Sequence, residues 1–176
     1  MTPQTPPDPT APIRIDWLSD TDILALLARP AQCQALFGHP ALLLELQHLI
    51  QTDPANAHWY RPACVYRGDL AVAAGGFKGK PVKGTVELGY RTHTEWRRQG
   101  HATALVRWLC AVASQERLTR VVAVTAPGNL ASQAVLAQTG FVHTGDLLSD
   151  SQQWLQRWQH TLSSHPVPTQ LRKFSG

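Results

Sequence analysis

The middle of the chain changes from a strand pattern to a helix pattern. Apolar and polar residues alternate over Thr85–Thr92, which predicts a strand. Over residues 100–117, apolar residues recur at intervals of three and four, which predicts an amphipathic helix. The buried stripe of this helix consists of Leu105, Trp108, Leu109 and Val112. The sequence therefore predicts a strand, a short connection and a helix in that order.

The same patterns predict five elements before this region. Ser19 and Asp20 are good N-cap residues for a helix, and Pro30 would end it. The predicted elements are a strand at residues 13–18, helices at 20–29 and 40–51, and strands at 59–67 and 69–77. Because short glycine-containing turns connect them, we expect the last two strands and Thr85–Thr92 to form an antiparallel meander.

Two strands and a helix follow before the last strand. Residues 121–124 are apolar throughout, which is typical of a strand buried on both faces. Asn129 can cap a helix over Leu130–Gln138, and Gly140 stands where a left-handed C-terminal cap belongs. The last strands are predicted at residues 141–148 and 152–161. Trp154 and Trp158 share one face of the second of these, although their spacing of four also fits a helix.

The composition indicates one globular domain. A chain of 176 residues, of which 43% are hydrophobic, is long enough to bury an ordinary core. Prolines crowd the first twelve residues, and the end of the chain is polar with Pro166 and Pro168. Such segments bury too little apolar surface to fold by themselves. We therefore expect flexible tails at 1–12 and 163–176, and one domain at 13–162.

Several function classes lack support in the sequence. No run approaches the ~20 apolar residues of a membrane helix, and the N-terminus has no export signal. Cys33, Cys64 and Cys110 are widely spaced and odd in number, which favours reduced thiols in a cytoplasm. The net charge of +4 is modest, so a phosphate-bearing small molecule explains it as well as nucleic acid does. No zinc, nucleotide-hydrolysis or esterase motif is present. We expect a cytoplasmic protein that binds no metal, nucleic acid or membrane; a homodimer is compatible with the sequence.

The connection between the central strand and helix has the chemistry of an anion site. Arg97 and Arg98 precede Gly100 at a point where helical N–H groups are still unpaired. Glycine allows a phosphate to approach the backbone, and the positive end of the helix dipole attracts it. The alternative is that both arginines are merely solvated, although their charge opposes the dipole at this position.

These residues resemble a known family. Arg97, Gly100 and Ala102 match the (Gln/Arg)-x-x-Gly-x-(Gly/Ala) motif of the GNAT superfamily of acyl-CoA-dependent N-acetyltransferases. Residues 125–132 and 140–141 resemble the second signature of that family, a strand, an Asn-initiated helix and a Gly-Phe strand start. The likeness is to the branch that contains ribosomal-protein N-terminal acetyltransferases, and it covers about half the chain. It implies an α/β fold with a mixed, centrally split β-sheet flanked by helices.

The resemblance also implies acetyl-CoA as a co-substrate. Its pyrophosphate would bind the N–H groups of residues 98–103, and its pantetheine arm would pair with the backbone of residues 89–92, opposite 124–126. The implied cofactor-binding residues are Gly89, Tyr90, Arg91, Thr92, Arg97, Arg98, Gln99, Gly100, His101, Ala102, Thr103, Asn129 and Ser132. For Gly89 the alternative is a bulge or a weak point in the strand, and for Asn129 it is a pure N-cap.

Catalysis requires a group that takes a proton from the acceptor amine, because only the neutral amine attacks a thioester. Glu87 is the candidate general base, since it lies on the central strand just before the backbone that would hold the thioester. A solvated charge on the strand face is the alternative. The family's usual general acid is a tyrosine seven residues after Asn129, and that position is Leu136 in this chain. The acid is therefore unassigned.

We predict an N-acetyltransferase that moves the acetyl group of acetyl-CoA to a primary amine of a small molecule or a protein N-terminus. The amine would attack directly in a ternary complex. Because Leu136 replaces the tyrosine, the alternative is a non-catalytic, regulatory acyl-CoA-binding module of the same fold. Residues 20–51 and the last strands should line the acceptor pocket, but they contain no arrangement that identifies the acceptor.

Overall fold

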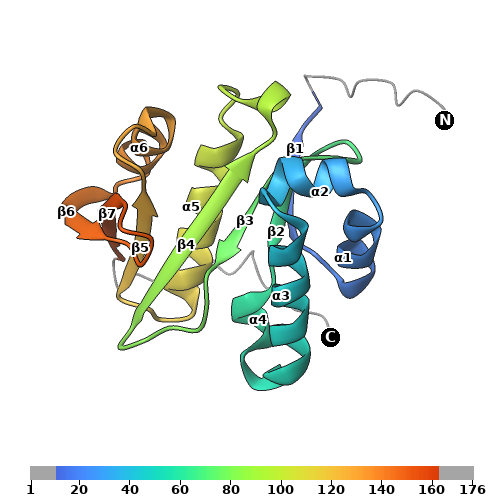
Figure 1. Cartoon of the computed structure of the whole chain (residues 1–176), viewed down its shortest axis with the longest axis horizontal. Helices are drawn as coiled ribbons and strands as arrows, with labels where there is room; N and C mark the ends of the chain where they lie inside the picture. The colour runs from blue at the N-terminus through green and yellow to red at the C-terminus, as the bar shows by residue number, and fades with distance from the viewer. Residues whose placement is uncertain (1–10, 163–176) are drawn as a thin grey trace.

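A sheet of seven strands in the order β1-β2-β3-β4-β5-β7-β6 forms the centre of the computed structural model, which describes residues 11–162 (Figure 1). Neighbouring strands are antiparallel except β4 and β5, which are parallel. The strands are β1 (Ile13–Trp17), β2 (Ala63–Arg67), β3 (Leu70–Phe77), β4 (Thr85–Thr92), β5 (Arg120–Thr125), β6 (Val142–Leu148) and β7 (Trp154–Thr161). Apart from Ala11 and Pro12, the expected tails lie outside the described residues.

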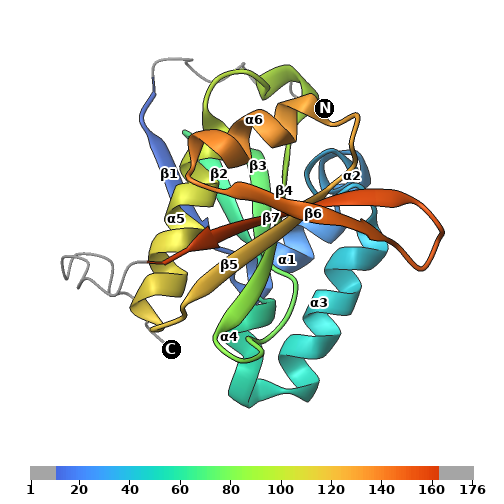
Figure 2. The ribbon, with the colours of Figure 1, turned by 90° about the vertical axis from the view of Figure 1, so that its left-hand side faces the viewer.

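Helices cover both faces of this sheet. They are α1 (Asp20–Leu27), α2 (Pro30–Phe37), α3 (Pro40–Thr52), α4 (Ala57–Tyr60), α5 (His101–Gln115) and α6 (Leu130–Gln138), with short 3-10 turns η1 (Pro54–Asn56) and η2 (Thr94–Trp96). Figure 2 shows α5 on one side of the sheet and α1, α2 and α3 on the other. Each side has its own apolar core, with Leu105 and Leu88 in the first and Leu36 and Leu43 in the second. The predicted mixed α/β sheet flanked by helices is confirmed.

The sequence interpretation is incomplete or wrong in two places before β2. The first helix ends before Pro30, as predicted, but the sequence did not predict α2. Pro30 occupies the first turn of α2, where a missing N–H breaks no hydrogen bond. The predicted strand at 59–67 is wrong over its first part. Trp59 and Tyr60 belong to α4, where the Trp59 ring packs 5.2 Å from that of Phe77 and the Tyr60 hydroxyl donates to Asp53 over 2.9 Å.

The last third of the described chain follows the sequence prediction. The side chain of Asn129 accepts a hydrogen bond from Ser132 N over 3.1 Å and so caps α6. Gly140 adopts the left-handed conformation with a φ of +86°. Trp154 and Trp158 both lie on β7, so the strand interpretation is confirmed and the helical alternative is wrong. Within residues 11–162, no helix has the length and apolar character needed to span a membrane.

Candidate active site

The sheet is split at its centre because β4 and β5 pair only over the first four residues of each strand. Their parallel register runs from Thr85 opposite Arg120 to Leu88 opposite Ala123, and it stops there. Beyond that point β4 remains paired with β3 and β5 remains paired with β7. Figure 1 shows the two strands diverging beyond their paired ends. The structure thus contains the split that the family resemblance implies.

The open edge of β4 presents backbone groups to this split. Lys78 N donates to Glu87 O over 2.8 Å, so the odd-numbered residues of β4 turn their peptide groups toward β3. Successive residues of a strand turn these groups to opposite sides. Among the four residues expected to hold pantetheine, Tyr90 and Thr92 therefore direct their N–H and C=O groups into the split, whereas the other two face β3.

Gly89 lies where the split begins. It pairs with Gly76 in a regular register, so the alternative of a β-bulge at this position is wrong. A Cβ on Gly89 would lie 3.1 Å from Cε of Lys78. The missing side chain therefore makes room for the lysine side chain beside the split.

We call the connection before α5, residues 98–100, the nest, because it places two left-handed residues at the start of a helix. Gly100, at the N-cap of α5, has a φ of +80°, and Arg98 has a φ of +62°. The first N–H groups of a helix have no partner within it, and no side chain caps α5. Arg97 and Arg98 are exposed, and neither joins an ion pair within residues 11–162.

His101, the first residue of α5, turns its side chain away from this nest into the core. The residue is 1% exposed, and neither ring nitrogen has a hydrogen-bond partner among the described residues. Its ring packs 6.1 Å from that of Trp96. Burial, and secondly the charge of Arg67, lower the pKa of His101 below its ordinary value. The side chain of His101 therefore does not face the start of α5, and only its backbone N–H belongs to that start.

Tyr90 reaches across the split to α6. Its hydroxyl lies 2.8 Å from the hydroxyl of Ser132 and donates to Ser132 O over 3.2 Å. Burial raises the pKa of Tyr90, and the contact with Ser132 offsets part of that rise, so the hydroxyl keeps its proton at neutral pH. Since the Asn129 side-chain oxygen caps the helix at Ser132, its NH₂ group remains available to a ligand. Sequence reasoning assigned Tyr90 a backbone role and missed this side-chain contact.

The carboxylate of Glu87 is bound by a lysine that sequence reasoning also missed. Lys78 Nζ lies 2.6 Å from Glu87 Oε1, and both side chains are partly exposed. Glu87 alternates with Val86 and Leu88, which are buried beneath α5, so this ion pair lies on the opposite face, on the side of α1, α2 and α3. The only available signal was that both residues flank one short turn between strands.

Two other positions complete the surroundings of the split. Arg91 Nε donates to Ala35 O over 3.1 Å, which ties β4 to α2. Leu136 is fully buried in the core beneath α6. The position of the family's tyrosine therefore contributes packing in this chain and no proton donor.

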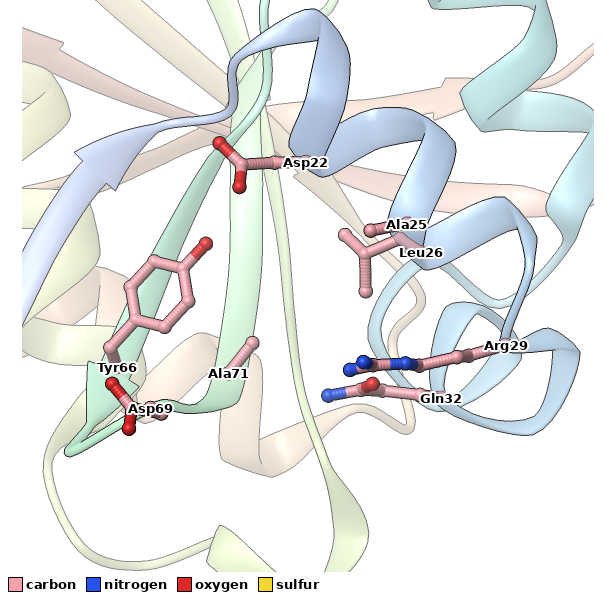
Figure 3. Close-up of a pocket in the computed structure, with 8 residues that line it drawn as sticks. All are labelled: Asp22, Ala25, Leu26, Arg29, Gln32, Tyr66, Asp69 and Ala71. Atoms are coloured by element: carbon pink, nitrogen blue, oxygen red, sulfur yellow. The ribbon is translucent and has the colours of Figure 1, made fainter.

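A separate hollow lies between α1, α2 and the turn from β2 to β3, with a volume of about 130 Å³. Figure 3 shows the polar groups of Asp22, Arg29, Gln32 and Tyr66 around it. None of the residues expected to bind the cofactor lines this hollow. It is therefore distinct from the split between β4 and β5.

Residues 13–142 match the family model described as "Acetyltransferase (GNAT) domain". The match spans more than half of the chain and includes the split, the nest and the start of β6. The chain belongs to the GNAT acetyltransferase family. This membership supports the assignment of the chain as an acetyl-CoA-dependent N-acetyltransferase. No curated protein sequence matches the chain.

Solved structures of GNAT acetyltransferases share the fold. A spermidine N-acetyltransferase from Vibrio cholerae in complex with CoA and spermine is 16% identical, with a TM-score of 0.67 over 86% of this chain and 96% of that one. RimJ from Mycobacterium smegmatis, in complex with CoA-disulfide, is 18% identical, with a TM-score of 0.68 over 87% and 83%. The ribosomal-protein-S5-alanine acetyltransferase from Vibrio fischeri is 16% identical, with a TM-score of 0.66 over 85% and 93%. At these identities the likeness is one of fold.

Proposed function

We propose that this GNAT protein transfers the acetyl group of acetyl-CoA to a primary amine of a small molecule or a protein N-terminus. The observation that carries the proposal is the end of β4–β5 pairing at Leu88, together with the uncapped start of α5 that follows the far end of β4. An unpaired strand edge and a nest of N–H groups are the two features that a pantetheine arm with a pyrophosphate requires. Solved structures of the same fold hold CoA, CoA-disulfide or acetyl-CoA.

The proposed cofactor site uses both of these features. The N–H groups of residues 98–103 would bind the pyrophosphate, with charge from Arg97 and Arg98. The backbone groups of Tyr90 and Thr92 would pair with the pantetheine amides across the split. Gly89 and Arg91 support that edge through their pairing with β3, and Asn129 with Ser132 lies on the opposite side of the split.

Glu87 is the proposed general base. It lies one residue before the last β4–β5 pair, on the face of the sheet that α1, α2 and α3 share. Its carboxylate would take the proton that an acceptor ammonium must lose before the nitrogen can attack the thioester carbonyl. A CoA thiolate with a pKa near ~8.5 is a tolerable leaving group, so the absence of a tyrosine at Leu136 does not prevent transfer.

Calorimetric titration of acetyl-CoA tests the cofactor site. The unmodified protein should bind, and Arg98→Ala should weaken binding roughly tenfold or more, because a hydrogen bond to a charged group contributes about 1.5–3 kcal/mol. Arg107→Ala is the matched control, since this exposed arginine lies on α5 and away from its start. Absence of binding to the unmodified protein would overturn the proposal.

The alternative function is a non-catalytic acyl-CoA-binding module. Two observations favour it. Leu136 offers no proton donor, and the carboxylate of Glu87 already forms an ion pair with Lys78. The two functions differ in the effect of Glu87→Gln when thiol release is followed with a panel of primary amines. An enzyme should lose at least roughly 100-fold in rate with cofactor affinity unchanged. A binding module would release no thiol before or after the substitution.

A further inference from the structure

The side chain of Lys78 brings an amine next to the proposed general base. Its ammonium is 2.6 Å from Oε1 of Glu87, the proposed base. Its Cε is 3.1 Å from the position that a Cβ on Gly89 would occupy. Lys78 N also donates to Glu87 O, so the two residues face each other directly across the β3 and β4 edges. The backbone thus places the two residues opposite each other, and the ion pair holds the amine at the carboxylate, with the lysine side chain beside the start of the split.

This position coincides with the point at which the sheet opens. Leu88 is the last residue of β4 that pairs with β5, and Gly89 is the first that does not. The lysine side chain crosses the face of Gly89 that an absent Cβ leaves free. A thioester held at the start of the split on this face would therefore lie beside the Lys78 side chain.

We propose that Lys78 is an acetylation site of the protein itself, modified in cis by acetyl-CoA bound in the split. The inference rests on the proposed function, because it needs the thioester at the start of the split. The Lys78 ammonium gives one proton to Glu87, and the nitrogen lone pair then forms a bond to the thioester carbonyl carbon. The bond from that carbon to sulfur breaks, and the CoA thiolate takes the second proton that the nitrogen loses. The products are Nε-acetyllysine and CoA thiol, and the proton on Glu87 passes to solvent.

The modification removes a competitor from the site. An acetylated lysine carries no positive charge, so it no longer forms the ion pair with Glu87. The Glu87 carboxylate then becomes available to the ammonium group of another acceptor. Acetylation of this one lysine, in the basic turn between β3 and β4, would thus free the Glu87 carboxylate from its ion pair.

The same turn provides a matched control. Lys80 Nζ lies 3.6 Å from Asp53 Oδ2, and its side chain is 56% exposed, against 53% for that of Lys78. Non-enzymatic acetylation depends on exposure and would therefore modify both lysines at similar rates. Acetylation by the site would modify Lys78 alone, because Lys80 is directed toward η1 by Asp53.

The test incubates the purified full-length chain, shown by mass to be unacetylated, with acetyl-CoA and no other amine. We expect one acetyl group per chain on Lys78, one equivalent of released thiol, and a rate per chain that does not change when the protein is diluted. Lys78→Arg should release no thiol, and Glu87→Gln should slow the modification roughly 100-fold or more. Lys80→Arg should change neither result.

Three outcomes would overturn the inference. Equal rates at Lys78 and Lys80 would show non-enzymatic chemistry, and a rate that rises with protein concentration would show transfer between molecules. Binding of acetyl-CoA in the calorimeter without acetylation of Lys78 would remove this inference and leave the proposed function standing. Absence of acetyl-CoA binding would instead remove the proposed function and this inference with it.

Discussion

The hydroxyl of Tyr90 on β4 lies 2.8 Å from that of Ser132 on α6, on opposite sides of the place where the sheet is open. No strand pairing joins β4 to β5 at this level. The contact therefore connects β4 to α6 beyond Leu88, where the pairing of β4 with β5 has ended.

Tyr90→Phe and Ser132→Ala should each lower the free energy of unfolding by about 1 kcal/mol, the usual contribution of one hydrogen bond. In urea denaturation, the double variant should lose clearly less than the sum, because either change alone removes the same bond. Tyr60→Phe, whose hydroxyl binds Asp53 in another part of the fold, should instead add to Tyr90→Phe. Simple additivity of the Tyr90 and Ser132 changes would contradict the coupling.

Gly75 on β3 is required for the close approach of β3 and β4 beside the site. A Cβ at Gly75 would lie 2.5 Å from Gly89 O and 2.9 Å from Tyr90 Cβ. We expect Gly75→Ala to cost about 1–3 kcal/mol or more, the usual range for forcing extra atoms into a packed core. Gly79→Ala, with no atom within 4 Å of its added Cβ, should stay within about 0.5 kcal/mol of the unmodified protein in thermal unfolding. Equal effects at the two glycines would contradict the packing argument.

His101 should make stability depend on pH. Its pKa is lowered in the folded protein, chiefly by burial, so the unfolded chain binds a proton more readily. Stability is therefore fully present above the unfolded pKa of about 6.5 and is lost as pH falls from there toward the lower folded value.

His101→Phe should reduce this loss and raise the melting temperature at acidic pH, because it also removes two buried nitrogens without partners. Melting temperatures at about pH 7.5 and about pH 5.5 provide the measurement, since these values lie on either side of the ordinary histidine pKa. The exposed His48 is the control, and His48→Gln should leave the pH dependence unchanged. A histidine-to-phenylalanine variant with the original pH dependence would refute the role of His101.

A substitution at Gly100 should lower both the stability of the protein and its affinity for acetyl-CoA, whereas a matched glycine elsewhere should affect stability alone. The φ of +80° at Gly100 disfavours any residue with a Cβ, although an added Cβ would meet no atom within 4 Å. Gly100→Ala should therefore cost about 1–2 kcal/mol of stability through the backbone alone. It should also weaken acetyl-CoA binding, because the nest would relax. Gly68→Ala shares the positive φ and the open surroundings but lies in the turn between β2 and β3, outside the proposed cofactor site, so it should lower the melting temperature without affecting affinity.

The elements that sequence reasoning located share a strong local signal. The alternation of apolar and polar residues over Thr85–Thr92 and the apolar stripe of α5 are unambiguous. Asn129 and Gly140 mark the two ends of α6, because their residue types suit the N-terminal and C-terminal caps of a helix. Pro30 is ambiguous in a single sequence because it fits the end of one helix as well as the first turn of the next. Trp59 and Tyr60 suit either a strand or a helix, and their partners in β3 and at Asp53 decide between them.

Some features of the candidate site could likewise be predicted from the local sequence, and others could not. The nest at Arg98 and Gly100 lies within a few residues, so its chemistry was visible in sequence order. The split was implied by the family resemblance and by no local pattern. The contacts of Glu87 with Lys78 and of Tyr90 with Ser132 depend on strand register and on how α6 packs, neither of which a single sequence fixes.

Beyond Leu88, β4 is paired on one edge only, and this should affect how fast its individual amide protons exchange with solvent. Gly89 and Arg91 hold their amide protons in hydrogen bonds to β3, whereas Tyr90 and Thr92 turn theirs into the open split. Solvent exchange in the free protein should therefore alternate from residue to residue along one strand, slow at Gly89 and Arg91 and fast at Tyr90 and Thr92. Acetyl-CoA lying as an additional strand would slow the fast amides and leave the slow ones nearly as they were, so the alternation itself would report occupancy of the site.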